Sequence, residues 1–334
     1  MAIKSYKGFD KNLRCRGFQY KIGGIYEMDG KIKMRNRGFH ACESPFDVFD
    51  YYTMIDSRFC EVEQDGNISK WDRGTKICSS KIKIKAELKL ADMINLGVEW
   101  LKEITSPEKI KTSIKDNSSG NYAKIGSSGD KAQIGSSGYG AKIGSSGYVA
   151  QIGSSGDEAQ IGSSGYGAKI GSSGYGAQIG SSGYGAKIGS SGYGAKIGSS
   201  GYGAKIGSSG NDAQIGSSGY GAQIGSSGND AKIGSSGNNA QIGSSSDGAK
   251  ISSSGYGAKI DSTGEDCVIM CAGINSVAKA SKGSWVTLSE WSYSEEKQRY
   301  IPICVKTEFV DGEKIKADTY YSLKGGVFVE WIND

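Results

Sequence analysis

A mainly β fold, organised around a parallel β-solenoid, is predicted from three features of the sequence. One nine-residue phrase, A-[K/Q]-I-G-S-S-G-Y-G, recurs sixteen times between Ser118 and Ser262, and no step departs from nine residues. Its alanine and isoleucine never change, whereas the position between them is always Lys or Gln. Glycine and serine fill most other positions, as tight turns require. A fixed period of this size is typical of solenoid proteins.

Each repeat supplies one short strand and one corner. Side chains alternate across a strand, so Ala123 and Ile125 are expected to face the core while Lys124 faces water. The segment 126–129, Gly-Ser-Ser-Gly, is then expected to turn the chain, because glycine accepts positive φ angles. The next two positions are usually Tyr-Gly but also Asp-Lys or Asn-Asp, which indicates an exposed corner.

The expected coil of the solenoid contains two repeats, or eighteen residues. Such a coil is a flattened helix with two parallel sheets, and it resembles the nine-residue calcium β-roll. No aspartate recurs at a fixed position, so calcium is not expected here. A coil of one repeat is an alternative. An oligomeric roll is another, because the Ala-x-Ile-Gly phrases resemble the repeats of trimeric surface-adhesin heads. Disorder is disfavoured by the strict isoleucine period.

The flanking segments predict two smaller domains around the solenoid at 118–263. Residues 1–110 have ordinary globular composition and predict an α+β domain, with a helix opening at Ser44-Pro45 and another over 90–104. Residues 264–334 predict a degenerate last coil and an antiparallel β cap, since solenoid ends need covering. The cap's expected strands are 284–291, 301–309, 314–321 and 326–331, with a core of Trp285, Trp291, Tyr320 and Trp331.

Composition narrows the class of protein. The 334-residue chain carries a net charge of +5, which neither requires nor excludes an anionic partner. Its seven cysteines lack regular spacing, it contains no run of eighteen apolar residues, and its first residues do not lead us to expect a signal peptide. We expect a cytoplasmic protein with mostly buried thiols, no membrane span, no metal and no cofactor.

The N-terminal segment contains a cluster at Arg37–Pro45 that includes His40, the one histidine of the chain. His40 beside Cys42 lacks the third group of a nucleophilic triad. Together with Cys60 these residues do not show zinc-ligand spacing. Packing is therefore the favoured role of the cluster, with His40 kept as a catalytic candidate.

Three short motifs resemble those of ADP-ribosyltransferases in order: Tyr6-Lys7-Gly8, Gly38–Glu43 and Glu61-Val62-Glu63. The resemblance implies an enzyme in residues 1–110 with the solenoid as a spacer, and Glu61 and Glu63 as catalytic candidates. The sequence departs from that family because Lys7 replaces an arginine and no Ser-Thr-Ser motif is present.

A longer resemblance covers nearly the whole chain. The segments Cys-Arg-Gly-Phe-Gln-Tyr at 15–20, Gly-Phe-His-Ala-Cys-Glu at 38–43 and Lys-Ala-Asp-Thr-Tyr-Tyr at 316–321, with the nonapeptides, resemble a family of uncharacterised phage and prophage proteins. The resemblance implies a phage or mobile-element origin. It implies no activity and transfers no functional residues.

A non-enzymatic interaction protein is the function that these patterns favour. A rigid rod with outward lysines and tyrosines suits recognition of a macromolecular partner, either a protein or a protein–nucleic-acid complex, and in a phage setting a host defence complex. Homo-oligomerisation and ice binding are alternatives. The expected contact residues come from the most regular repeats: Lys169, Lys187, Lys196, Lys205, Tyr166, Tyr175, Tyr184, Tyr193 and Tyr202.

Overall fold

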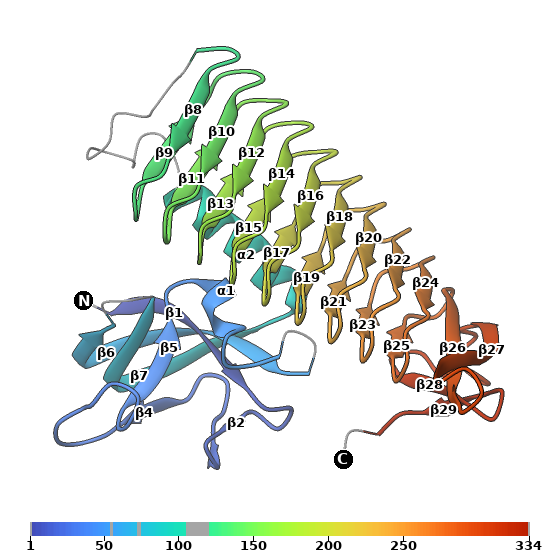
Figure 1. Ribbon diagram of the computed structural model, residues 1–334. Helices are drawn as coiled ribbons and strands as arrows, with labels where there is room; N and C mark the ends of the chain where they lie inside the picture. Colours follow the sequence, from blue (N-terminus) through green and yellow to red (C-terminus); the bar gives the residue numbers. More distant parts are fainter. Residues whose placement is uncertain (1, 54–55, 72–74, 105–119, 333–334) are drawn as a thin grey trace. The chain divides into compact units, whose positions relative to one another are not determined.

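The computed structural model describes residues 2–53, 56–71, 75–104 and 120–332 (Figure 1). The chain divides into two compact units, Met1–Trp100 and Leu101–Asp334. The predicted domain end at residue 110 and the predicted solenoid start at 118 lie outside the described residues.

The first unit is the predicted α+β domain. Its elements are, in order, β1 (Ile3–Phe9), β2 (Arg14–Cys15), β3 (Phe18–Gln19), β4 (Ile25–Glu27), β5 (Phe39–Cys42), α1 (Pro45–Val48), β6 (Arg58–Lys70), β7 (Lys76–Leu88) and α2 (Leu90–Ile104). The last helix, α2, extends a few residues past the end of the unit at Trp100.

Four antiparallel strands of this unit close into a small barrel. β6 pairs with both β1 and β7, and β5 bridges β1 to β7, so the ring has no open edge between them. β4 adds to β7 beyond the end of β5. Phe9, Val62, Ile82 and Ile84 are fully buried in the barrel core. Only one residue pair, Tyr6 with Cys42, joins β1 to β5.

The predicted helix at Ser44-Pro45 is present, but it is a single turn. Ser44 takes the extended N-cap conformation, Pro45 begins α1, and the helix ends at Val48. Gly97 of α2 lies against the ring of Phe46, where a Cβ would be 2.6 Å from the nearest ring atom. This close approach explains why a glycine interrupts an otherwise helix-favouring segment.

The solenoid of the second unit is built from four-residue strands, which have the sequence Lys/Gln-Ile-Gly-Ser up to Ser244 and depart from it in the four strands from Lys250 onward. They alternate between two sheets. The even-strand sheet contains β8 (Lys124–Ser127), β10 (Lys142–Ser145), β12 (Gln160–Ser163), β14 (Gln178–Ser181), β16 (Lys196–Ser199), β18 (Gln214–Ser217), β20 (Lys232–Ser235), β22 (Lys250–Ser253) and β24 (Val268–Cys271). The odd-strand sheet contains β9 (Gln133–Ser136), β11 (Gln151–Ser154), β13 (Lys169–Ser172), β15 (Lys187–Ser190), β17 (Lys205–Ser208), β19 (Gln223–Ser226), β21 (Gln241–Ser244), β23 (Lys259–Ser262) and β25 (Val277–Ala280).

The structure confirms the coil of two repeats. Each strand pairs in parallel with the strand eighteen residues away, as Ile179 does with Ile197, and backbone N–H groups donate to carbonyls of the preceding coil, as Lys196 does to Ala177 at 2.8 Å. The alternative of one repeat per coil is therefore wrong. The expected strand limits also need correction, because Gly126 and Ser127 continue the strand instead of turning the chain. The turn comes two residues later.

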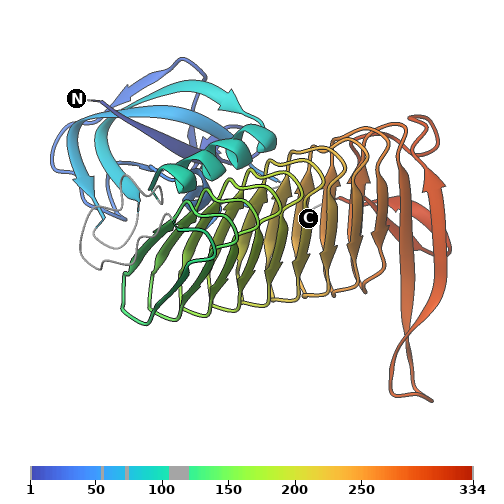
Figure 2. The same ribbon diagram turned by 90° about the horizontal axis from the view of Figure 1, so that it is seen from above.

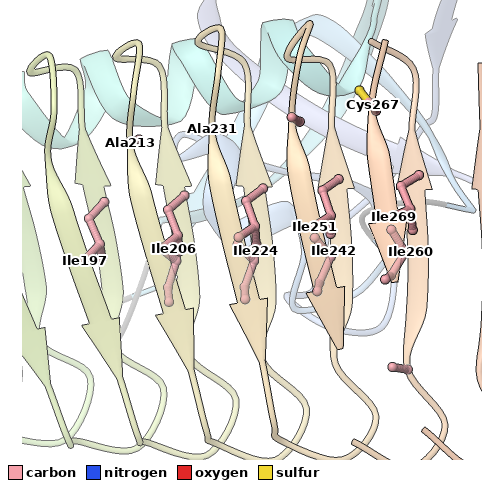
Figure 3. Packing of buried hydrophobic residues seen from close by; sticks show 14 of the residues in the cluster. Ile197, Ile206, Ala213, Ile224, Ala231, Ile242, Ile251, Ile260, Cys267 and Ile269 are labelled. Atoms are coloured by element: carbon pink, nitrogen blue, oxygen red, sulfur yellow. The ribbon is translucent and has the colours of Figure 1, made fainter. Parts of the chain in front are cut away.

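The solenoid core is the predicted row of isoleucine and alanine. Figure 3 shows Ile197 and Ile251 from the even-strand sheet facing Ile206, Ile224 and Ile242 from the odd-strand sheet. All five are at most 3% exposed. From Ser136 onward, the first serine of each repeat also points inward and is buried, so the core is thin and partly polar.

Two hairpins cap the solenoid, one on each sheet. β26 (Trp285–Ser294) pairs in parallel with β24 and turns into β27 (Arg299–Phe309), the long hairpin at the end of the stacked coils in Figure 2. β28 (Tyr321–Lys324) pairs with β25 and turns into β29 (Val327–Glu330).

The details of this cap differ from prediction. The expected strand over 314–321 is a turn region that reaches β28 only at Tyr321. The expected aromatic core is also wrong, since Trp285 is 48% exposed and Trp291, Tyr320 and Trp331 are only half-buried. The buried side chains include Val286, Leu288 and Ile315, which continue the solenoid core. An aliphatic row extends the isoleucine stack more closely than bulky indole rings would.

Candidate functional site: the outer face of the even-strand sheet

The outer face of the even-strand sheet carries three parallel rows, each with one residue per coil. The first is the exposed lysine row, Lys124, Lys142, Gln160, Gln178, Lys196, Gln214, Lys232 and Lys250. The second, here called the glycine trough, is Gly126, Gly144, Gly162, Gly180, Gly198, Gly216 and Gly234. The third is an exposed serine row at the second serine of each repeat. A shallow groove of about 1170 Å³ follows the lysine row and the trough from Lys142 to Met270.

Nothing inside the molecule requires glycine in the trough. Its residues do not have positive φ angles. A Cβ built on Gly180, Gly198 or Gly216 meets no atom within 4 Å. Glycine within a strand costs about 0.5 to 1 kcal/mol relative to alanine, and it often marks a place where a ligand or another backbone approaches closely.

The second glycine of the repeat is different, because packing between coils explains it. A Cβ on Gly201 would lie 2.0 Å from the carbonyl oxygen of Gly183 in the preceding coil. The coils approach too closely there for a side chain without a local shift. Packing between coils therefore explains the second glycine of the repeat but not the trough glycines.

The lysine row is a positive surface without acidic neighbours on its own face. No ion pair joins Lys142, Lys196 or Lys232 to any residue within the described ranges. Most carboxylates of the repeats lie instead at the corner that leads from odd to even strands: Asp157, Glu158, Asp212, Asp230, Asp247, Glu265 and Asp266. The face is thus basic, and one of its long edges is acidic.

The structure divides the predicted tyrosines between two edges of the solenoid. Tyr166, Tyr184 and Tyr202 lie at the corner after the even strands, within a stack that runs from Tyr148 to Tyr220. The ring centroids in this stack are 5.0–5.2 Å apart and the planes differ by 3–9°. Tyr175 and Tyr193 stack at the opposite corner.

The predicted lysines are divided too. Lys196 lies exposed in the lysine row. Lys169, Lys187 and Lys205 lie on the odd-strand sheet in direct register, as the eighteen-residue coil requires. The first two are half-buried and Lys205 is buried. The structure therefore does not gather the four lysines and five tyrosines into one patch. The sequence does not predict the trough, because Gly-Ser-Ser-Gly is equally compatible with a turn.

The three catalytic candidates of the first unit are not brought together in a reactive arrangement. Glu61 pairs with Lys4 at 2.9 Å, and Glu63 pairs with Lys85 at 2.8 Å. Nε2 of His40 accepts the backbone N–H of Arg35 at 3.0 Å, and burial together with nearby positive charges lowers the pKa of His40 to about 4. His40 is thus a neutral hydrogen-bond acceptor at neutral pH.

The described residues contain few features of other kinds of site. All seven cysteines are free thiols, and five are buried. Among the described residues, no group of three or more His, Cys, Asp or Glu side chains is placed to hold a metal ion. The helices in this same part of the chain lack the length and apolar character needed to cross a membrane.

Comparison with known proteins identifies one domain. Residues 3–96 match a family described as a domain of unknown function, DUF7666. This match covers the barrel of the first unit and excludes the solenoid. No curated protein and no solved structure matches the chain.

Proposed function

We propose that this protein is a non-enzymatic binding protein whose solenoid presents the lysine row and glycine trough to an acidic surface of a partner protein. The observation that most supports this proposal is the glycine trough. Seven strands accept the cost of an outward glycine that internal packing does not require, and the main chain there is open to close approach.

The spacing of the charges favours a protein as the partner. The five lysines of the row extend over seven coil steps, which is about 34 Å at 4.8 Å per step. Duplex DNA carries one charge per roughly 1.7 Å, so this row is sparse for nucleic acid. A flat, rigid sheet with separated positive charges complements a protein surface with scattered carboxylates.

The proposed partner belongs to the host of a phage. The resemblance to phage and prophage proteins supports action in the cytoplasm of an infected host. A host defence complex is the class of partner that such a protein would inhibit by occupying its surface.

The test is capture of a partner from host lysate by the full chain, with and without nuclease treatment, followed by mass spectrometry. The variant Gly180→Val, Gly198→Val, Gly216→Val fills the trough. We expect it to melt at the same temperature or higher, because valine favours strands, and to lose the captured protein. Capture that survives the filled trough, or that disappears with nuclease, would overturn the proposal.

A matched pair of charge variants tests the choice of face. Lys142, Lys196 and Lys232 changed to Gln should weaken capture and flatten its salt dependence, since Gln already occurs in that row. Lys169, Lys187 and Lys205 changed to Gln remove the same charge from the other sheet and should have little effect. If the second variant loses capture and the first does not, the contact lies on the odd-strand sheet.

A further inference from the structure

The first unit contains a pocket that the solenoid proposal does not use. It has a volume of about 930 Å³, and residues of both β1 and β5, which share a single residue pair, line it. Lys7 of β1 and His40 of β5 line it, together with residues from the β2–β3 turn, β4, the segment after α1, and Lys76 of β7. We call it the Lys7 pocket. Its size is that of small-molecule sites in proteins.

Lys7 is a buried cation that lacks a counter-charge. It is 5% exposed, and its ammonium donates to the carbonyl of His40 at 3.0 Å and to the thiol of Cys15 at 3.4 Å. It also lies 5.3 Å from the ring centroid of Phe9. No carboxylate among the described residues pairs with it. Buried charges in proteins are ordinarily paired, and an ammonium has three N–H donors, of which one is left here.

Further positive groups surround the same space. Lys76 lies with its ammonium 4.0 Å from the ring centroid of Tyr51, and its pKa is lowered by burial and by the charges of Arg35, Arg16 and Lys7. His40 is kept neutral mainly by burial, and then by Lys76, Lys7 and Arg16. The carboxylate that lines the pocket, Glu27, is paired with Lys81 at 3.2 Å. The pocket therefore concentrates positive charge.

Aromatic rings form its other walls. Phe18 contacts Tyr20 and Tyr26 edge to face, with ring centroids 4.9 and 5.5 Å away. Phe18 is 50% exposed and Tyr51 is 53% exposed, although both line the pocket. Exposed rings next to converging cations suit a ligand that has both a flat ring and a negative charge.

We propose that the Lys7 pocket binds a small organic anion of the nucleoside phosphate class. Its phosphate contacts Lys7, Arg16 and Lys76, and its base stacks on Phe18 or Tyr51. Several converging cations favour a doubly charged phosphate over a single carboxylate. The ligand supplies the counter-charge that Lys7 lacks. This site lies in the DUF7666 domain and is independent of the solenoid face.

Calorimetric titration of the full chain with AMP, GMP, CMP and UMP tests the proposal, with the nucleosides and inorganic phosphate as comparisons. We expect at least one nucleotide to bind at least tenfold more tightly than its nucleoside and than phosphate. Equal affinity for a nucleotide and its nucleoside would show that the pocket does not bind the phosphate. Equal affinity for a nucleotide and inorganic phosphate would show that the pocket does not bind the base. Absence of binding by all four nucleotides would overturn the proposal.

Variants and a spectroscopic readout locate the binding. Lys76→Gln and Lys7→Met should each lower the affinity at least tenfold, and Lys85→Gln, which changes a lysine outside the pocket, should not. Because His40 is the one histidine, its NMR titration is unambiguous. Its imidazole signals should shift when the nucleotide binds, since His40 lines the pocket. His40 signals that stay unchanged under saturating nucleotide, or an unaffected Lys76→Gln variant, would contradict binding here.

Discussion

At the scale of single residues, the coil corners show how backbone conformation restricts the repeat. The second corner position has positive φ, +64° at Gly167 and +56° at Val149. Glycine adopts this conformation without cost, whereas an L-residue pays about 1 to 2 kcal/mol, and a β-branched side chain is least suited to it. The recurring Tyr-Gly pair therefore reflects a requirement at the glycine and exposure at the tyrosine.

This requirement predicts that Val149→Gly stabilises the protein. Relief of the left-handed strain exceeds the added flexibility of glycine in the unfolded chain, so the free energy of unfolding should rise by about 0.5 to 1 kcal/mol. Gly167→Val is the reverse change at the equivalent corner of the next coil and should lower it by a similar amount. Chemical denaturation of both variants measures the effect. A less stable Val149→Gly protein would show that packing of the valine outweighs its strain.

The exchange of tyrosine for Asn or Asp at the first corner position also has a physical cause. The side-chain oxygen accepts a hydrogen bond from the backbone N–H eighteen residues later; Oδ1 of Asp157, for example, accepts the N–H of Tyr175 at 2.8 Å. The same bond is made by Asn121, Asp130, Asn211, Asn238 and Asp247. The sequence predicted an exposed corner but not this bond, because the partner is identified only when the coil length is known.

At the scale of the strand, the inward and outward assignments followed from alternation alone. Ile197 is 3% exposed, and its neighbour Lys196 is exposed. What alternation could not decide was where the strand ends, since Gly-Ser is compatible with both a turn and a strand. That ambiguity concealed the trough, which exists only because the glycine stays in the strand with its open side outward.

A pair of substitutions tests this assignment. Ile197→Asp places an unpaired charge among stacked apolar rows and should cost at least about 3 kcal/mol of unfolding free energy. Lys196→Glu alters an exposed position and should change it by less than about 1 kcal/mol. Thermal melts followed by circular dichroism compare the two. Equal melting temperatures would mean that the strand faces are assigned incorrectly.

At the scale of the whole molecule, the repeat was enough to predict the solenoid but not the details of the cap or of the first unit. The cap was predicted as antiparallel, and it is, but its two hairpins each extend one solenoid sheet, and Val286 and Leu288 continue the core where tryptophans were expected. The Lys7 pocket was not predicted. Lys7, Arg16, His40 and Lys76 come from separate elements, and no local motif indicates that the barrel brings them together.

The claim on which every surface assignment depends is that one coil holds two repeats, because this places alternate repeats on opposite faces. Its most direct test is an engineered disulfide. Gln160 and Gln178 are exposed register partners on adjacent even strands, about 4.8 Å apart, within the range that a disulfide spans. Gln160 and Lys169 lie on different sheets.

We predict that mild oxidation of a Gln160→Cys, Gln178→Cys variant forms the bridge, as mapped by non-reducing peptide mass spectrometry. A Gln160→Cys, Lys169→Cys variant should not form one. A bridge between 160 and 169, with none between 160 and 178, would indicate a coil of nine residues and contradict the account.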